Sequence, residues 1–362
     1  METSFFLGAN TPDGFFGYFD SFVNVETADH LYIIKGGPGT GKSSAMKKIA
    51  KAAAERGLDT QMILCPSDPD SSDGLFIPEK RLAFVDGTAP HVLDPAYPGA
   101  FERIVNFADF LDCGRLKDDL WQIIELDAIY KGHRRRANSL IKAAACLIED
   151  SDGAAALFID NGKLAELAEK QAAPFTENRA GKRGREFKRF LNGVTPDGFK
   201  CLYGTAAAMA GRVVVLDDEH GIMSRFLGDL KERFLSAGYD VYACASPIAP
   251  LARLEHIIAP EIGCAWVTRN CYQDLSAGTS FDFSSADIEK IDAKKFVRPS
   301  FFQDNKSRLA FNRKTAKSLL KETVAALADA RRVHGGIEER YIGAMDFSGL
   351  DEFIERLIRR HL

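Results

Sequence analysis

The sequence contains no long apolar run, no paired cysteines and no excess of positive charge. A transmembrane helix needs about 18 or more consecutive apolar residues, so the first absence argues against a membrane span. The N-terminal stretch METSFFLGANTPDG is acidic, and its apolar run is too short for a signal peptide. We therefore expect a cytoplasmic protein with no membrane partner.

Cysteine occurs at seven positions, but none of them form a CxxC pair. Zinc sites and disulfide frameworks need regular cysteine spacing, so reduced thiols are the simplest interpretation. The net charge of -4 argues against a generally basic surface and therefore against nucleic acid as a partner. The length of 362 residues, with 46% hydrophobic and 27% charged, indicates a globular chain of two domains.

The strongest motif lies in LYIIKGGPGTGKSSAMKKI, residues 31–49. Gly36, Gly41, Lys42 and Ser43 match GxxxxGK[ST], the pattern of a phosphate-binding P-loop. Such a loop turns its backbone N–H groups toward a phosphate, and the helix that follows favours the same anion. A strand-like run precedes the motif and a helical pattern follows it, as a P-loop requires. The predicted nucleotide-binding residues are Gly36, Gly37, Pro38, Gly39, Thr40, Gly41, Lys42, Ser43 and Ser44.

A P-loop site also needs an acidic residue that orients Mg²⁺ at the end of a neighbouring strand. The segment LAFVD, residues 82–86, provides four apolar residues and then Asp86. We predict that Ser43 and Asp86 hold Mg²⁺ and that Lys42 contacts the β- and γ-phosphates of ATP. A turn aspartate is the alternative, because Asp-Gly is a common turn pair. The next residue, Gly87, replaces the water-activating glutamate of many motor ATPases, which argues against a fast motor.

Two further segments supply candidate catalytic groups. The stretch CPSDPDSSDG follows an apolar run, so Asp68, Asp70 and Asp73 are expected at the carboxyl end of a strand, near the γ-phosphate. There they could activate an acceptor hydroxyl or a water, although a solvated loop explains the stretch equally well. His91 follows Asp86 closely and is a candidate phosphate contact, although a lone histidine is more often structural.

The chain contains an internal repeat. TPDGF stands at residues 11–15 and again at residues 195–199. A gapless alignment about 181 positions apart places YIIK on VVVL and GGPGTGKS on DDEHGIMS. In the second copy Met223 replaces the P-loop lysine, and Thr268 replaces the Mg²⁺-orienting aspartate.

Three carboxylates, Asp217, Asp218 and Glu219, occupy the second loop and are expected to face the phosphate position. Like charges there would repel a nucleotide, so we expect one active site and one pseudo-site. The predicted fold is α/β, with two tandem P-loop NTPase-like modules, each a mainly parallel sheet flanked by helices with a helical appendage. The predicted boundaries are 1–175 for the first module, 176–187 for a linker and 188–362 for the degenerate module.

Helical appendages are expected at about residues 99–150 and 300–333. In the first, HRRR (residues 133–136) is expected to open a helix, either as a solvated face or as an arginine lid over the nucleotide. The last helix, GLDEFIERLIRRHL, has its apolar residues on one face, which predicts docking onto the core.

The segments KGGPGTGKSSAMKKIA, CPSDPDSSDG and VDGTAPHVLDP, in this order, resemble a family of poorly characterised bacterial ATPases built from two tandem P-loop modules. The resemblance implies an ATP-binding α/β fold, with Lys42, Ser43 and Asp86 at the family's nucleotide and Mg²⁺ positions. Members of the family usually retain a P-loop in the second copy, and this sequence departs from the family there.

Three functions are consistent with these features. The first is a slow, Mg²⁺-dependent ATPase, and the second is a kinase acting on a small molecule or nucleotide. The third is a non-catalytic, nucleotide-gated interaction protein. The sequence contains no NKxD guanine-reading motif, which favours ATP over GTP. It does not specify an acceptor substrate or a protein partner.

Overall fold

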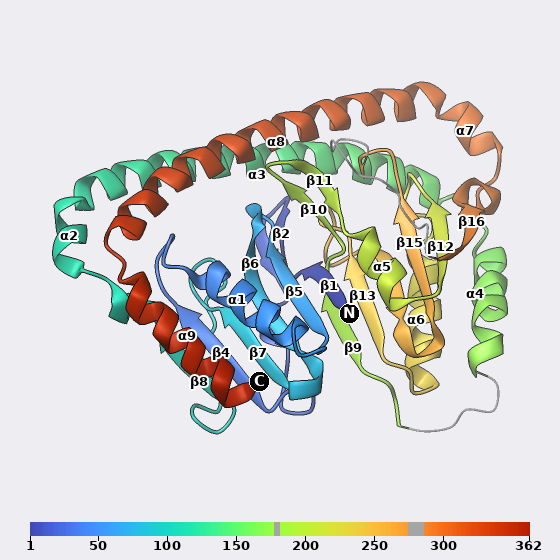
Figure 1. Ribbon diagram of the computed structural model, residues 1–362. Coiled ribbons are helices and arrows are strands. Elements are labelled where there is room, and N and C mark those ends of the chain that lie inside the picture. Colours follow the sequence, from blue (N-terminus) through green and yellow to red (C-terminus); the bar gives the residue numbers. More distant parts are fainter. Residues whose placement is uncertain (177–181, 274–285) are drawn as a thin grey trace. The chain divides into compact units, whose positions relative to one another are not determined.

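The computed structural model describes residues 1–176, 182–273 and 286–362 (Figure 1). The described chain is an α/β protein with two six-stranded mixed sheets flanked by helices. None of its described helices combines the length and apolar character needed to cross a membrane. Part of the predicted linker, residues 177–181, lies outside the described residues.

The first sheet contains the segments on which the P-loop prediction depends. In spatial order its strands are β1 (Glu2–Phe6), β5 (Thr60–Cys65), β6 (Asp68–Ile77), β7 (Leu82–Asp86), β4 (His30–Lys35) and β8 (Glu102–Asn106). The strands predicted before the loop, before Cys65 and before Asp86 are confirmed. The stretch CPSDPDSSDG is not a loop, because most of it forms β6, which is antiparallel to both β5 and β7.

The second sheet repeats this order strand for strand. Its strands are β9 (Glu186–Arg189), β13 (Val241–Ala245), β14 (Leu254–Ala259), β15 (Cys264–Arg269), β12 (Arg212–Asp217) and β16 (Asp287–Asp292). As in the first sheet, the third strand is antiparallel to both of its neighbours, and the other pairs are parallel. Each sheet is therefore mixed rather than uniformly parallel.

The repeated TPDGF sequence forms the same turn twice. The first copy joins β2 (Gly8–Thr11) to β3 (Gly14–Gly17), and the second joins β10 (Asn192–Thr195) to β11 (Gly198–Cys201). In each turn the threonine hydroxyl donates to the glycine carbonyl, at 2.8 Å in the first copy and 2.9 Å in the second. Both glycines have positive φ, +107° and +115°, which a side chain would disfavour.

The helices include two that exceed 35 residues. They are α1 (Lys42–Ala54), α2 (Cys113–Asp118), α3 (Leu120–Ala156), α4 (Asn161–Thr176), α5 (Tyr203–Met209), α6 (Ser224–Ser236), α7 (Ser300–Asp304), α8 (Lys306–Gly343) and α9 (Phe347–His361). The HRRR run lies inside α3 rather than at its start, because the helical pattern begins well before it. The predicted first appendage also includes β8, so it is not wholly helical.

The described chain divides into two compact units that alternate along the sequence. Unit 1 comprises Met1–Gly8, Gly17–Ala137 and Ala325–Leu362, and unit 2 comprises Ala9–Phe16 and Asn138–Val324. The predicted boundaries at residues 175 and 188 do not coincide with these units. The C-terminal segment, assigned from the sequence to the second module, belongs with the first sheet.

The apolar face of α9 explains this placement. Leu350, Ile354 and Ile358 are buried in one core with Met46 and Ile49 of α1. Burying an aliphatic side chain of this size contributes about 1.5–3 kcal/mol, so α9 gains stability by covering α1. The predicted core docking of the last helix is confirmed, and its docking partner is α1, the helix that follows the glycine-rich loop.

Candidate functional site

The loop between β4 and α1, residues 36–41, is in unit 1. Strand β4 is a buried inner strand, parallel to β7 and β8. Gly39 and Gly41 have φ values of +67° and +84°, a region that favours glycine. Gly41 is also the residue immediately before α1, so the loop leads directly into a helix N-terminus.

Lys42 folds back over this loop. Its Nζ donates to the carbonyl oxygens of Gly36 at 2.8 Å and Gly37 at 2.7 Å, and it lies 3.5 Å from Oδ2 of Asp86. Two residues singled out from the sequence, Lys42 and Asp86, therefore form an ion pair. They meet because parallel neighbouring strands, β4 and β7, end at the same edge of the sheet.

Ser43 and Asp86 supply the oxygen atoms of the predicted Mg²⁺ site. The Ser43 hydroxyl accepts a hydrogen bond from the backbone N–H of Ser72 at 2.9 Å. Oδ1 of Asp86 accepts one from the backbone N–H of Thr88 at 2.8 Å. A hydroxyl and a carboxylate are oxygen donors of the kind that Mg²⁺ prefers, so these residues fit the ion.

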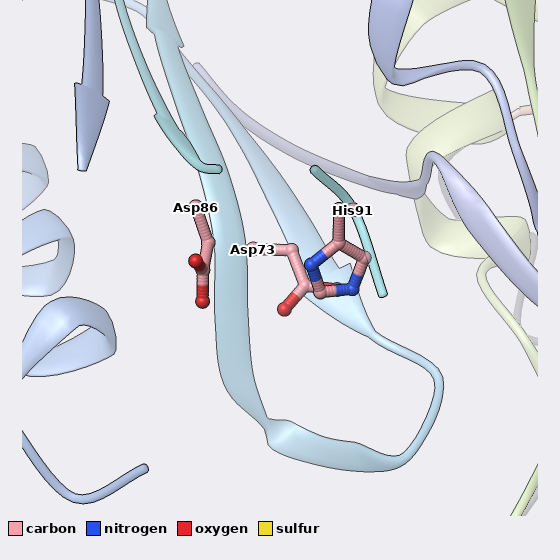
Figure 2. Close-up of side chains that lie close together, drawn as sticks. All are labelled: Asp73, Asp86 and His91. Atoms are coloured by element: carbon pink, nitrogen blue, oxygen red, sulfur yellow. The ribbon is translucent and has the colours of Figure 1, made fainter. Parts of the chain in front are cut away.

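Asp73 and His91 lie beside Asp86 in a buried cluster, shown in Figure 2. Nε2 of His91 is 3.4 Å from Oδ2 of Asp73, and the two side chains are only 7% and 6% exposed. Burial raises the pKa of Asp73 to about 6; His91 opposes this shift and the negative charge of Asp86 adds to it. The sequence therefore identified both members of a buried acid–histidine pair.

The other two candidate carboxylates of this stretch lie elsewhere. Asp68 is 3.6 Å from Arg331 and accepts a hydrogen bond from Ser71 at 2.7 Å. Asp70 is exposed. The register between β6 and β5 shifts twice along this stretch, and there Asp73 is buried while Asp70 is exposed. The prediction treated the three aspartates alike, and the pairing of β6 distinguishes them.

A cavity of about 470 Å³ connects these groups within unit 1. Its lining includes the residues of the glycine-rich loop and the helix start from Pro38 to Ser44, together with Asp68, Asp73, Asp86 and His91. The volume falls in the range typical of small-molecule sites. The cavity is thus large enough for more than a single phosphate group.

The lining also includes helical residues that the sequence did not single out. Among them are Tyr130 of α3 and Arg331, His334 and Glu338 of α8. Burial lowers the pKa of His334 and raises the pKa of Glu338. The sequence signal that could have identified the three α8 residues is their spacing: Arg331, His334 and Glu338 are three and four positions apart, which places them on one face of the helix.

Arg134, in the HRRR run, also lines the cavity. Its guanidinium donates to the Ser67 hydroxyl at 3.1 Å. The prediction of an arginine over the nucleotide site therefore has a specific candidate in Arg134.

In unit 2 the corresponding loop, between β12 and α6, has its backbone N–H groups occupied by one of its own side chains, Asp218. Asp218 is 2% exposed. Its two carboxylate oxygens accept hydrogen bonds from the backbone N–H groups of His220 at 3.0 Å and Met223 at 2.7 Å. The other two acidic residues do not converge with it, since Asp217 pairs with Arg269 and Glu219 pairs with Arg313. The expectation that all three face one anion position is therefore wrong.

A second buried polar group in unit 2 surrounds Arg253. Its guanidinium lies 3.0 Å from Asp152 and 3.6 Å from Glu255. The adjacent His256 is fully buried, and its Nδ1 accepts a hydrogen bond from the backbone N–H of Thr268 at 3.0 Å. Here an arginine of the protein balances the buried carboxylates.

Comparisons of the chain with protein-family models, with curated proteins and with solved structures found no match.

Proposed function

We propose that unit 1 binds ATP with Mg²⁺ and hydrolyses it slowly. The observation that carries this proposal is the ion pair between Lys42 and Asp86 at the rim of a glycine-rich loop that opens a helix. Two loop carbonyls and Asp86 hold the lysine ammonium group. We infer that phosphate oxygens take the place of these contacts when ATP enters.

The chain's own residues have distinct roles in this proposal. The loop N–H groups and Lys42 bind the phosphates, while Ser43 and Asp86 hold Mg²⁺, which screens phosphate charge when it is bound. We assign to Asp73 the role of accepting a proton from an attacking water or acceptor hydroxyl, and a carboxyl pKa that burial raises to about 6 supports this role. Gly87 in place of a glutamate after Asp86 is consistent with slow turnover.

We further propose that both sheets derive from one P-loop module and that the second has lost nucleotide binding. The matching strand order and the matching TPDGF turns support a common origin. Asp218 supports the loss of binding, because its carboxylate already uses backbone N–H groups of the second loop. The expected stoichiometry is therefore one ATP per chain.

A kinase is the second candidate. The cavity extends beyond the P-loop to Asp73, Arg134 and Arg331, which gives an acceptor molecule both space and charged partners. A nucleotide-gated interaction protein without turnover is the third candidate, and for it the same site would bind ATP without hydrolysing it.

Titration calorimetry with ATP and Mg²⁺ tests the site. Wild-type protein should bind one ATP, and Lys42→Ala should show no measurable binding. Lys51→Ala, an exposed lysine of the same helix, is the matched control and should bind normally. Unchanged binding by Lys42→Ala would contradict the assignment, and two ATP per chain would contradict the pseudo-site.

Turnover assays then separate the three functions. Phosphate release without an acceptor supports the ATPase. ADP formation that depends on an added alcohol or nucleotide supports the kinase. ATP binding without either reaction supports the nucleotide-gated interaction protein.

A further inference from the structure

The cluster of Asp73, Asp86 and His91 combines donor atoms from three segments of unit 1. Asp73 comes from β6, Asp86 from the end of β7, and His91 from the loop after β7 (Figure 2). One ligand atom from each lies within 4.8 Å of the other two. All three residues also line the cavity, so an ion and its remaining ligands have access from one side.

The Asp73 carboxylate is buried with an incomplete set of polar contacts. Its residue is 4% exposed, and Oδ2 accepts no hydrogen bond. The Cys65 thiol contacts this carboxyl group. A buried carboxylate needs a cation or strong hydrogen bonds to offset the loss of water.

The second sheet provides an internal comparison. Gly74 of β6 pairs with Val85 of β7, and His256 of β14 pairs with Val267 of β15. The two valines are equivalent, because they directly precede the equivalent residues Asp86 and Thr268. The residues before Gly74 and His256, which are Asp73 and Glu255, are therefore equivalent as well. In unit 2 the buried Glu255 lies 3.6 Å from Arg253. The position equivalent to this arginine in β6 is Ser71, which is uncharged.

The two copies therefore neutralise a buried acid differently. In unit 2 the buried acid is Glu255, and Arg253 neutralises it. Unit 2 has no second carboxylate at the position of Asp86, because the equivalent residue is Thr268. Unit 1 has two carboxylates and an imidazole close together, and the Lys42 ammonium group pairs with Asp86 and also acts on Asp73 through its charge. One negative charge beside His91 is left for a bound cation or for a protonated histidine to neutralise.

We propose that Asp73, Asp86 and His91 bind a divalent first-row transition metal ion of the Mn²⁺ type. The two carboxylates supply anionic oxygen ligands for a divalent ion, and an imidazole nitrogen favours a transition metal over Mg²⁺, which prefers oxygen ligands. Three protein ligands leave coordination positions open toward the cavity. Asp86 is shared with the Mg²⁺ site of the proposed function, but the present inference does not depend on ATP binding.

Mn²⁺ is a suitable probe because thiols bind it weakly and the chain has seven cysteines. Electron paramagnetic resonance of the full chain without nucleotide should show one bound Mn²⁺ per chain. Pulsed measurements should detect modulation from a coordinated imidazole nitrogen. Absence of binding, or binding without the nitrogen signal, would overturn the proposal.

Variants identify the ligands. His91→Gln should abolish the nitrogen signal and weaken Mn²⁺ binding at least tenfold, and Asp73→Asn should weaken binding by a similar factor. His133→Gln and Asp70→Asn, matched changes outside the cluster, should bind Mn²⁺ like the wild type. Normal binding and an intact nitrogen signal in His91→Gln would overturn the proposal. If Asp73→Asn fails to fold by circular dichroism, His91→Gln decides.

Lys42→Ala separates this proposal from the nucleotide proposal. Removing the ammonium group should leave Mn²⁺ binding intact or tighter, because a competing positive charge near Asp86 is lost. Loss of ATP binding with retained Mn²⁺ binding supports both proposals. If Lys42→Ala still binds ATP, only the nucleotide proposal is contradicted. If Lys42→Ala loses Mn²⁺ binding, only the metal proposal is contradicted.

Discussion

The carboxylate of Asp218 accepts a hydrogen bond from the backbone N–H of Met223 at 2.7 Å. Met223 immediately precedes α6, and N–H groups at such a position are the ones that bind an anion in a phosphate-binding loop. In this chain a side chain supplies the anion. This relationship is the physical reason for expecting one nucleotide per chain rather than two.

Replacement of Asp218 should destabilise unit 2. Asp218→Ala leaves the buried N–H of Met223 and the N–H of His220 without their acceptor, so we expect the free energy of unfolding to fall by roughly 1–3 kcal/mol. Urea denaturation measures the change. Glu219→Ala removes a partly exposed ion pair with Arg313 and should cost less than about 1 kcal/mol. Equal losses in the two variants would contradict the role assigned to Asp218.

Gly39 should not tolerate a side chain. Its φ is +67°, and a Cβ atom there would lie 2.7 Å from the carbonyl oxygen of Glu338. Gly39→Ala should therefore lower stability by about 1 kcal/mol or more and weaken ATP binding. Gly132→Ala, in open space inside α3, should instead raise stability by up to about 1 kcal/mol. Thermal unfolding of the pair measures both effects, and a neutral Gly39→Ala would contradict the loop geometry.

Arg134 should affect turnover more than folding. An arginine that reaches transferred phosphate stabilises the charge of the transition state, and its loss in other phosphoryl-transfer enzymes costs about 10³-fold or more. We expect Arg134→Ala to lower the rate of ATP turnover at least tenfold with little change in melting temperature. Arg332→Ala is the control, because its side chain is 76% exposed and pairs with Asp329. Equal rates for the two variants would show that Arg134 only lines the cavity.

His256 should make stability depend on pH. Burial lowers its pKa to about 3, while an exposed histidine titrates near 6.5. The unfolded chain therefore binds a proton as the pH falls below about 6.5 and the folded chain does not, so stability is lost as pH falls. The loss from this group between pH 7 and pH 5 should be about 2 kcal/mol.

Urea denaturation at several pH values measures this dependence. His256→Asn should flatten it by the same amount relative to the wild type. A slope that does not change in the variant would show that His256 titrates normally in the folded chain. The comparison between variant and wild type is needed because carboxylates also titrate in this range.

Several features of the candidate site were predictable because they depend on local sequence. The strands before the loop and before Asp86 are apolar runs, and strands that are parallel neighbours bring Lys42 and Asp86 to one edge of the sheet. The strand formed by CPSDPDSSDG was missed, because its serines and aspartates are typical turn formers. Pairing with β5 and β7 overrides that preference.

The sequence by itself determined the glycine-rich loop, the helix that follows it and the two TPDGF turns, since backbone conformation there depends on adjacent residues. It also determined that the second loop lacks a lysine. Only the tertiary structure decided that Asp73 rather than Asp70 joins Asp86 and His91, because the pairing of β6 sets which side chains point inward. It likewise decided that residues 325–362 belong with the first sheet. The reason is physical: the apolar face of α9 fits the core beside α1, and contacts between residues some 300 positions apart leave no local signal in the sequence.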